Sequence, residues 1–348
     1  MIDYLIVGSG IAGICFAETA LQNNKSILVF DNNSQNSSKI AAGIYNPVIL
    51  KRFSQVWNAT EQLEYLNDFY PKIEQRIQTK IDYKISILRK FYNIQEQNDW
   101  FTASDKPHLA PFLSSELFRQ KFKSIQSPFD YVEVVHTGYV NTSVMLQQFQ
   151  EFLSSNNLLL KQSFDFEKLL LNDHFLSYND IKAKHIIFAE GFGLHSNKYF
   201  NNLPLDGTKG EILVIKAPNL NLNCIINSSI YIVPLGNNLF KVGATYHWDD
   251  KTNQPTEQGK QELIDKIKEL LDCDFEIMEH VAGVRPTVKD RKPLVGTHAI
   301  YKNLHILNGL GTRGVMLGPS LARDLYDNIE NNKPINIHID IKRFVKNK

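Results

Sequence analysis

Short apolar runs alternate with helical periodicities along the chain, most clearly in the first thirty residues. Tyr4–Val7 is an apolar run that predicts a buried strand, and Ile27–Phe30 predicts a second one. Between them, Ile14, Ala17 and Leu21 recur at the spacing of one helix face. The pattern therefore predicts a strand–helix–strand unit at the N-terminus.

Similar patterns continue to the C-terminus without an internal repeat. Helical spacing predicts helices around residues 63–70, interrupted or kinked at Pro71, and around 144–152, 263–271 and 317–329. Apolar runs predict strands at 184–189, 209–215, 230–234, 240–245 and 305–307. The polar segment 32–39 is expected to be a loop, and the aromatic-rich residues 80–135 are expected to be strands and loops of a second domain.

Composition and charge narrow the class of protein. The 348 residues are enough for two domains, and 43% hydrophobic with 22% charged residues excludes a disordered or fibrous chain. Lys and Arg number 38 against 37 Asp and Glu, so the net charge is +1. Because a dedicated nucleic-acid-binding protein usually has a basic excess, no nucleic-acid partner is expected.

Cysteines and the N-terminus indicate a compartment. Cys15, Cys224 and Cys273 are far apart and form no CxxC pair, so we expect neither a metal site nor a disulfide framework. Met1–Val7 lacks the basic region of a signal peptide, and no run of eighteen apolar residues occurs. We therefore expect a cytoplasmic protein without a membrane span.

A glycine-rich turn, GSGIAG, follows the first predicted strand. Gly8 permits the tight turn, Gly10 lets the backbone approach a pyrophosphate, and Gly13 lets helix and strand pack closely. Asp31 follows Gly13 by eighteen residues, close to the roughly 20-residue spacing of an acid that binds ribose. Together these residues predict a dinucleotide site; the alternative is a chance glycine turn.

Blocks over nearly the full length share their order with one enzyme superfamily. They are GSGIAG with Asp31, SSKIAAGIYNP (37–47), HTGYVNT (136–142), IIFAEG (186–191), YIVP (231–234) with KVGAT (241–245), GVRPTVKD (283–290) with PLVG (293–296), and GLGTRG (309–314). In this order they resemble the D-amino-acid oxidase, glycine oxidase and sarcosine oxidase superfamily of flavoenzymes.

The resemblance implies an α/β fold in which a glutathione-reductase-like, Rossmann-type FAD-binding domain carries an inserted mixed-sheet substrate domain. We expect the FAD-binding domain at 1–52, 139–205 and 285–348, and the substrate-binding domain at 53–138 and 206–284. The sarcosine oxidase branch attaches FAD to a cysteine about where Gly283 stands, and no cysteine of this chain is near. The resemblance therefore implies non-covalent FAD. Asp31 is a second departure, since the family more often has Glu there.

For substrate and catalysis, the resemblance singles out two side chains. Arg285 in the GVRPT block corresponds to the arginine that binds the substrate carboxylate, for which a guanidinium offers paired donors. Its alternative role is to bridge the two domains through an internal acid. Lys241 corresponds to a lysine that lies near flavin N5 and promotes oxygen reduction; the alternative is a solvated lysine on a strand face.

The remaining site residues follow from the same blocks. The GLGTRG turn before a helix implies positive potential at the flavin pyrimidine edge, to which Arg313 adds charge; the alternative is a plain helix start. Tyr246, Tyr45 and Arg313 are expected to contact substrate, although Tyr45 is equally compatible with a turn before Pro47, and His247 is expected to be packed or solvent-facing. The expected cofactor-binding residues are Gly8, Ser9, Gly10, Ile11, Ala12, Gly13, Asp31, Asn32, Ala41, Ala42, Gly43, Gly191, Gly309, Gly311, Thr312, Arg313, Gly314 and Val315.

The reaction that the resemblance implies is oxidation of an amine or amino-acid C–N bond by hydride transfer to flavin N5, giving an imine that hydrolyses. Oxygen or another acceptor then reoxidises the flavin. Two enzyme alternatives stay open: an oxidase acting on a carboxymethylaminomethyl-modified tRNA wobble uridine, and a 2-hydroxy-acid dehydrogenase. The non-enzyme alternative is a flavin-binding protein without turnover.

Overall fold

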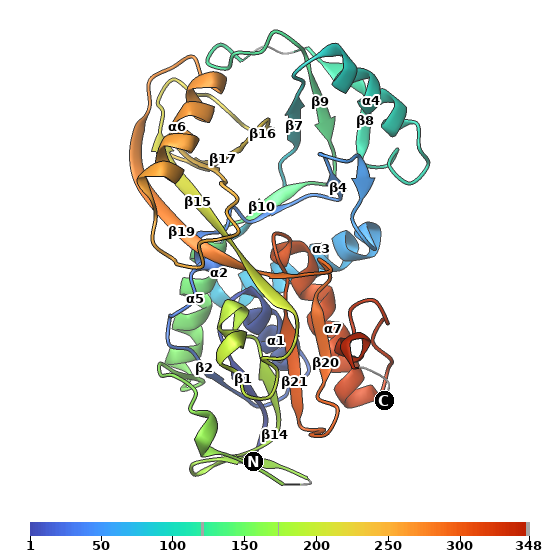
Figure 1. Ribbon diagram of the computed structural model, residues 1–348, viewed down its shortest axis with the longest axis vertical. Coiled ribbons are helices and arrows are strands. Elements are labelled where there is room, and N and C mark those ends of the chain that lie inside the picture. Colours follow the sequence, from blue (N-terminus) through green and yellow to red (C-terminus); the bar gives the residue numbers. More distant parts are fainter. Residues whose placement is uncertain (120–121, 173, 346–348) are drawn as a thin grey trace.

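The computed structural model of the protein describes residues 1–119, 122–172 and 174–345. Two large sheets lie at opposite ends of the long axis, and two long strands run between them (Figure 1). The lower sheet in this view contains the N-terminal strand, and α1 (Ile11–Gln22), α5 (Thr142–Ser155) and α7 (Gly314–Asn331) lie beside it. No helix in the described residues is both long and apolar enough to cross a membrane.

Five parallel strands form the centre of the first sheet. Their order is β11 (Leu159–Leu160), β2 (Ile27–Phe30), β1 (Ile2–Val7), β14 (Ile181–Phe188) and β21 (Leu304–Asn308). Three further strands, β12 (Leu169–Leu171), β13 (Leu176–Tyr178) and β20 (Leu294–Thr297), add antiparallel pairs. Because the chain leaves β1 toward β2 and later returns on its other side as β14, the carboxyl end of β1 is a topological switch point, where such sheets bind ligands.

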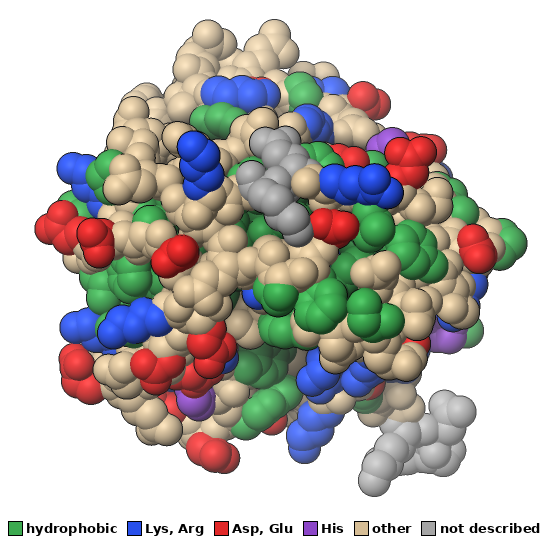
Figure 2. Space-filling model, turned by 90° about the horizontal axis from the view of Figure 1, so that it is seen from above, with side chains coloured by type: hydrophobic (Ala, Val, Ile, Leu, Met, Phe, Trp, Pro, Cys, Tyr) green, Lys and Arg blue, Asp and Glu red, His purple; other side chains and the backbone are tan. Residues whose placement is uncertain are grey.

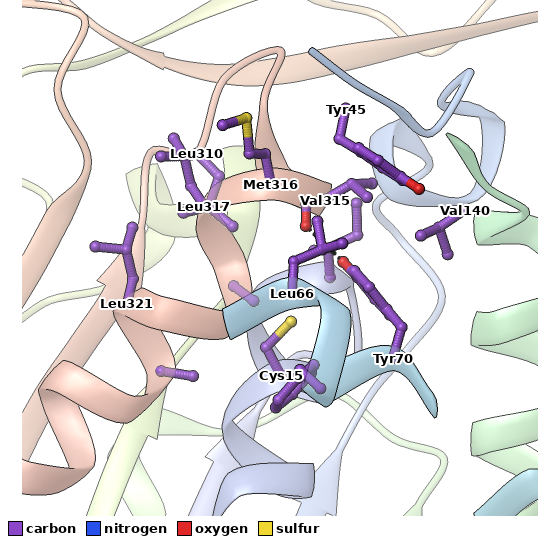
Figure 3. Packing of buried hydrophobic residues seen from close by; sticks show 14 of the residues in the cluster. Cys15, Tyr45, Leu66, Tyr70, Val140, Leu310, Val315, Met316, Leu317 and Leu321 are labelled. Carbon is purple, nitrogen blue, oxygen red and sulfur yellow. Dashed lines mark hydrogen bonds between the residues drawn. The ribbon is translucent and has the colours of Figure 1, made fainter. Parts of the chain in front are cut away.

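Four helices pack together beside this sheet: α1 (Ile11–Gln22), α3 (Ala59–Ile77), α5 (Thr142–Ser155) and α7 (Gly314–Asn331). Cys15, Leu66 and Val315 meet at the junction of α1, α3 and α7 (Figure 3). A Cβ at Gly318 would lie only 2.9 Å from the sulfur of Cys15, so α1 and α7 approach closely. The predicted strand–helix–strand unit at the N-terminus is therefore confirmed.

Helix α3 departs from one expectation. It runs through Pro71 without interruption, although a proline inside a helix costs about 3 kcal/mol. The buried face that includes Tyr70 and Ile73 explains this, and the Tyr70 hydroxyl donates to the carbonyl of Val315 at 2.6 Å. Helix α3, which the expected division of the chain places in the substrate-binding domain, packs on α7 (Figure 3).

The second sheet is mixed, as expected. Its order is β19 (Glu276–Val288), β15 (Leu205–Lys216), β18 (Leu239–Gly243), β17 (Tyr231–Gly236), β16 (Ile225–Asn227), β7 (Ile87–Lys90), β9 (Tyr131–Val134) and β8 (Leu113–Phe118). Among these pairs β16 and β7 are parallel and the others antiparallel. Helix α6 (Glu257–Leu270) packs on β15 and β18, and α4 (Ile94–Ser104) packs on β8.

Strands β15 and β19 connect the two layers. They pair antiparallel from Leu205 opposite Val288 to Lys216 opposite Glu276, and Figure 1 shows them crossing from one layer to the other. The halves of β15 and β19 nearer the first sheet therefore form part of the wall between the two sheets. The remaining short elements are α2 (Ser37–Ile40), β3 (Ile44–Tyr45), β4 (Val48–Ile49), β5 (Ser54–Gln55), β6 (Asp82–Tyr83) and β10 (Gly138–Val140), with the 3-10 turns Phe166–Lys168, Gly191–Ser196 and Ile341–Phe344.

Two helices correct the sequence expectations for loops. Helix α2 lies in the polar segment 32–39, and α4 lies in the region expected to hold only strands and loops. The start of α4 has a local signal: the side chain of Asn93 accepts from the Glu96 amide at 2.8 Å, and the Glu96 carboxylate accepts from the Tyr92 amide at 3.0 Å. Such capping marks the start of a helix. The helix was not predicted because its apolar residues show only a weak helical periodicity.

Candidate active site

A cavity of about 1650 Å³ opens between the carboxyl end of the first sheet and the face of the second. Val7, Phe30, Ala189 and Asn308, at or just after the ends of four strands, line one side. A pocket for one drug-sized ligand has roughly 300–1,000 Å³. This cavity therefore has room for a dinucleotide and a second molecule.

The glycine turn at the end of β1 is built for close backbone approach. Gly8 has φ of +100°, and a Cβ there would lie 2.5 Å from the carbonyl oxygen of Ala189. A Cβ at Gly13 would lie 1.8 Å from the Gly8 carbonyl oxygen, so Gly13 lets the helix pack on the turn and does not line the cavity. Both glycines fit the reasons predicted for them.

Two helix N-termini open into this cavity. Neither α1, which begins after Gly10, nor α7, which begins after Arg313, is capped by the side chain of its own N-cap residue. The amide of Ile11 donates instead to the hydroxyl of Ser38 at 3.1 Å. Gly311 has φ of +56° and open space around its missing Cβ. Free amides and helix dipoles at such ends favour anionic ligand groups.

Asp31 lies at the end of β2 and is held by the glycine turn. One carboxylate oxygen accepts from the amide of Ser9 at 2.6 Å and from its hydroxyl at 2.5 Å, and the other accepts from the Asn33 amide at 2.6 Å. Gln150 on α5 donates to the Ser9 hydroxyl at 2.6 Å. Asp31, Ser9 and Gln150 all line the cavity. The acid is therefore fixed beside the turn that precedes α1.

The segment after α2 contributes Ala41, Ala42 and Gly43 to the lining. Gly43 has φ of +72°, and a Cβ there would lie 1.9 Å from the Val140 carbonyl oxygen. The ammonium of Lys241 on β18 donates to the Ala41 carbonyl at 2.9 Å, although Lys241 itself does not line the cavity. Burial lowers the pKa of Lys241 to about 8, against a smaller opposing effect of Glu279.

Arg285 on β19 faces the cavity. Its terminal nitrogens lie 3.4 and 3.5 Å from the Thr245 carbonyl oxygen, and its guanidinium carbon lies 5.0 Å from the ring centroid of Tyr246. No ion pair links Arg285 to an acid within the described residues, so the bridge through an internal acid is not seen. Burial lowers its pKa, with Tyr246 opposing. The guanidinium is therefore available to a ligand carboxylate.

A buried polar network supports the segment that carries Tyr246. The Glu211 amide donates to the Thr245 hydroxyl at 2.9 Å, while its carboxylate accepts from Thr256 at 2.8 Å and contacts the His280 ring at 2.8 Å. Glu211 and the cavity-facing Gly210 are adjacent on β15, so they point to opposite faces of the strand. The network thus fixes the Thr245 carbonyl from behind.

Arg313 and two tyrosines form the neighbouring part of the wall. Arg313, Tyr246 and Tyr231 all line the cavity, and burial lowers the pKa of Arg313, with both tyrosines opposing and Arg291 adding to the lowering. Burial raises the pKa of Tyr231, and a hydrogen bond from Asn46 opposes the rise. Tyr231 was not among the predicted site residues.

Tyr45 does not reach the cavity. Its side chain is 2% exposed, and its hydroxyl donates to Asp82 at 2.9 Å, since β3 and β6 both pair with β10. Burial and the Asp82 carboxylate raise its pKa. A role in substrate contact is not supported by this position, and the alternative of a structural residue before Pro47 fits. Gly309 likewise does not line the cavity, because its missing Cβ faces Val288.

The other expected cofactor residues line the cavity: Gly8, Ser9, Gly10, Ile11, Ala12, Asp31, Asn32, Ala41, Ala42, Gly43, Gly191, Gly311, Thr312, Arg313, Gly314 and Val315. His247 is half-buried, with its Nε2 3.4 Å from a Glu262 oxygen. Glu190 is a missed lining residue whose pKa burial raises to about 7, against donation from Asn197 at 2.6 Å. Its place directly after a predicted strand was the available signal.

Neither a metal site nor a reactive cysteine is found at this cavity. Within the described ranges, no group of three His, Cys, Asp or Glu side chains is arranged to hold a metal ion. Cys15, Cys224 and Cys273 are free thiols, and none of the three lines the cavity. Glycine turns, two helix N-termini and Asp31 on the cavity wall are thus available to a dinucleotide. The wall has no thiol for covalent attachment.

The sequence is similar to known proteins. Residues 3–327 match the family of FAD dependent oxidoreductases abbreviated DAO. The chain is 26% identical over 241 residues to glycine oxidase of Bacillus subtilis, covering 67% of this chain and 62% of that protein. It is 25% identical over 150 residues to the tRNA 5-methylaminomethyl-2-thiouridine biosynthesis bifunctional protein of Idiomarina loihiensis, covering 41% of this chain and 24% of that protein. Both matches therefore span less than two thirds of the relative.

Solved structures show the same fold. Glycine oxidase from Geobacillus kaustophilus has a TM-score of 0.81 at 16% identity, covering 100% of this chain and 98% of that one. Glycine oxidase from Bacillus cereus has a TM-score of 0.77 at 18% identity, covering 96% of each chain. The predicted α/β fold of Rossmann type with a mixed sheet is thus confirmed, and since the family match covers residues 3–327, the chain belongs to the DAO family of FAD-dependent oxidoreductases.

Proposed function

We propose that the protein oxidises the C–N bond of a carboxylate-bearing amine or amino acid, with non-covalently bound FAD. The observation that carries this proposal is Arg285, a half-buried guanidinium on the cavity wall with no acidic partner in the described residues. Leaving such a charge unpaired away from water is costly, so a ligand carboxylate is its natural partner. Paired donors would also fix the orientation of that carboxylate.

The cavity wall offers matching groups for each part of FAD. The amides at the start of α1 would face the pyrophosphate, and Asp31 beside them would face ribose hydroxyls. The uncapped start of α7, after Gly311, would face the isoalloxazine edge and stabilise negative charge there. Bound FAD supplies the acceptor for the two electrons and the hydride removed from a CH–NH group.

The chain's own residues orient and shield the substrate in this proposal. Arg285 anchors the carboxylate, and Tyr246 holds the guanidinium in place from one side while the Thr245 carbonyl does so from another. Lys241 provides a buried positive charge behind the 41–43 segment, which we assign to the reaction with oxygen. The expected domain division and the roles of these residues remain part of the proposal.

The charge of the substrate-binding part argues against the tRNA alternative. Residues 53–138 and 206–284 hold 17 Lys and Arg against 23 Asp and Glu, so this part is acidic, whereas phosphate contacts by basic side chains dominate tRNA affinity. On the face of the second layer shown in Figure 2, basic and acidic side chains are interspersed rather than gathered into a basic surface. A small anionic amine therefore fits better than a polyanion.

The test of the proposal is anaerobic reduction of the bound flavin. The purified protein is expected to be yellow, to release its FAD on acid precipitation, and to bleach with a carboxylate-bearing amine but not with the matched 2-hydroxy acid. Bleaching by the 2-hydroxy acid alone would identify the protein as a 2-hydroxy-acid dehydrogenase. Tight, salt-sensitive tRNA binding would favour the wobble-uridine reaction, and absence of bleaching by any amine would refute amine oxidation.

A further inference from the structure

Acidic and basic groups are unequally distributed along the cavity. The acids among its lining residues are Asp31 and Glu190, and both lie at the glycine turn. Asp31 accepts from Ser9, and a Cβ at Gly8 would lie 3.3 Å from the Cα of Glu190. The acids are therefore confined to the part of the cavity that fits the phosphate and ribose.

Basic residues outnumber the acids on the cavity wall: Lys39, Lys51, Arg89, Arg285 and Arg313. In the parts of the chain that the structure describes, Arg89 has an ion pair, with Glu96, and the other four have none. Arg285 and Arg313 are both partly buried, so their charges are poorly screened by water. A ligand with a single carboxylate can pair fully with only one of the two.

The turn that carries Arg313 lies beside the strand that carries Arg285. The amide of Gly311 donates to the carbonyl of Pro286 at 3.0 Å, and both arginines line the cavity. Arg285 also stacks on Tyr246, which lines the cavity as well. Arg291 adds a further positive charge near Arg313 without lining the cavity. Arg285 and Arg313 therefore lie on adjoining parts of the cavity wall.

We propose that the preferred substrate is an amine carrying two carboxylates, one bound by Arg285 and the second by Arg313. This inference rests on the proposed amine oxidation and names its substrate class. Two guanidinium groups from different elements, β19 and the start of α7, would hold the two ends of the substrate and fix the central C–N bond between them.

The reaction itself is unchanged. The C–H bond breaks and its hydride passes to bound FAD, the nitrogen loses its proton to water, and the C=N bond forms. Dioxygen or another acceptor then takes the two electrons together with two protons, dioxygen leaving as hydrogen peroxide. Water adds to the imine, which separates into a carbonyl compound and an amine. Neither arginine gives up or takes a proton, because a guanidinium remains charged throughout the working pH range.

The experiment compares ligands that differ by one charge. Iminodiacetate and its monomethyl ester are tested for anaerobic flavin reduction. Glutarate and its monomethyl ester, which contain no nitrogen, are tested for binding through the change in visible flavin absorption. In the wild-type protein, the diacid of each pair is expected to have an apparent Kd lower by about tenfold or more, because it forms a second charge-assisted pair.

Arg313→Gln is expected to remove this preference. It should raise the Kd of both diacids by about tenfold or more and leave both monoesters within about threefold, since only the second carboxylate loses its partner. Arg291→Gln is the matched control, because it removes an equal exposed charge near Arg313 that does not line the cavity, and its effect should stay within about threefold on all four ligands.

The outcomes separate the two-carboxylate inference from the proposed amine oxidation. Equal affinity of wild-type protein for diacid and monoester would overturn the two-carboxylate inference, while reduction by the iminodiacetate monoester would still support amine oxidation. Equal losses on diacid and monoester in Arg313→Gln, or loss of FAD, would assign Arg313 to the cofactor and also overturn it. No reduction by any amine, with the diacid preference of glutarate intact, would refute the proposed oxidation while keeping the second anion site.

Discussion

The guanidinium of Arg285 occupies the space that a side chain at Gly210 would fill. A Cβ added at Gly210 would lie 1.9 Å from one terminal nitrogen of Arg285 and 2.2 Å from its central carbon. Gly210 lies on β15 and Arg285 on the neighbouring β19, where Arg285 pairs in register with Thr208. The absence of a side chain at residue 210 is therefore what allows the arginine to lie flat against the sheet beside the cavity.

Gly210→Ala is predicted to displace Arg285 without removing it. Since a misplacement of about 1 Å can cost about a hundredfold in rate, anaerobic flavin reduction by a carboxylate-bearing amine should slow by about that factor. FAD content should stay normal, because the cofactor groups lie elsewhere. Gly236→Ala, at an exposed turn with φ of +89° and open space, controls for general backbone strain and should leave the rate within about threefold. An unchanged rate in Gly210→Ala would contradict the packing argument.

Asp31→Ala is predicted to weaken FAD binding. Asp31 binds both the amide and the hydroxyl of Ser9, so its loss removes charged hydrogen bonds worth about 1.5–3 kcal/mol each from the turn and from the ribose site. Titration of apoprotein with FAD should show an affinity at least about tenfold lower. Flavin reduction in the reconstituted variant should be close to normal. Asp68→Ala, which removes an exposed carboxylate on α3 outside the cavity, is the control and should leave the FAD affinity unchanged. Equal affinities of wild type and Asp31→Ala would relocate the ribose contact.

Lys241→Met is predicted to slow reoxidation of the reduced flavin by oxygen. The ammonium is the charged form below its pKa of about 8, so in wild type the oxygen rate should fall as pH rises through about 8. The variant should be slow and nearly independent of pH in this range, while anaerobic reduction by substrate stays similar. Lys216→Met, an exposed lysine on β15, is the control. A wild-type pH profile retained in Lys241→Met would assign the titration to another group.

Acid is predicted to destabilise the protein through a buried histidine pair. His305 is 2% exposed, its Nε2 lies 3.1 Å from Nδ1 of His185, and its Nδ1 lies 2.8 Å from the Thr297 hydroxyl. Burial lowers the pKa of both histidines from 6.5. Below about pH 6.5 the unfolded chain therefore binds protons that the folded chain does not, and stability falls by up to about 1.4 kcal/mol per pH unit for each histidine.

His305→Gln tests this sign. The drop in the urea unfolding midpoint between pH 7.5 and 5.5 should be smaller in the variant than in wild type, because one of the two protonation sites is gone. The exposed His108 offers a matched control, and His108→Gln should keep the full wild-type drop. A drop of equal size in wild type and His305→Gln would mean that other groups cause the acid sensitivity.

Local sequence signals predicted the strand, glycine turn and helix at the N-terminus, which the structure confirms. The turn at Gly8 and the helix after Gly10 are dictated by residues within thirty positions of each other, so strand, turn and acid could be read together. Arg285 was found through a motif, and its position on the cavity wall agrees with the expectation. Such signals depend on backbone geometry and on short spacings along the chain, and both can be recognised in a single sequence.

Contacts between distant segments were not predictable from the same signals. Tyr45 turns away from the cavity because Asp82, on a strand paired to the same neighbour, accepts its hydroxyl. The ammonium of Lys241 donates a hydrogen bond to the carbonyl of Ala41, which lies two hundred residues earlier in the chain. Tyr231 lies on the cavity wall because β17 begins at the cavity that Arg313 also lines, and no spacing along the chain reveals this.

The role of Arg285 as the carboxylate anchor is tested most directly by stopped-flow reduction of the flavin in Arg285→Lys. The substrate is one amino acid presented anaerobically as acid, ester and amide, with Arg52→Lys, an exposed arginine outside the cavity, as control. The lysine keeps the charge but loses the planar fork, so reduction by the acid should slow by about a hundredfold, the ester and amide should change much less, and FAD content should stay normal. Equal losses on all three forms, or loss of FAD, would contradict the assignment and make Arg285 a structural residue.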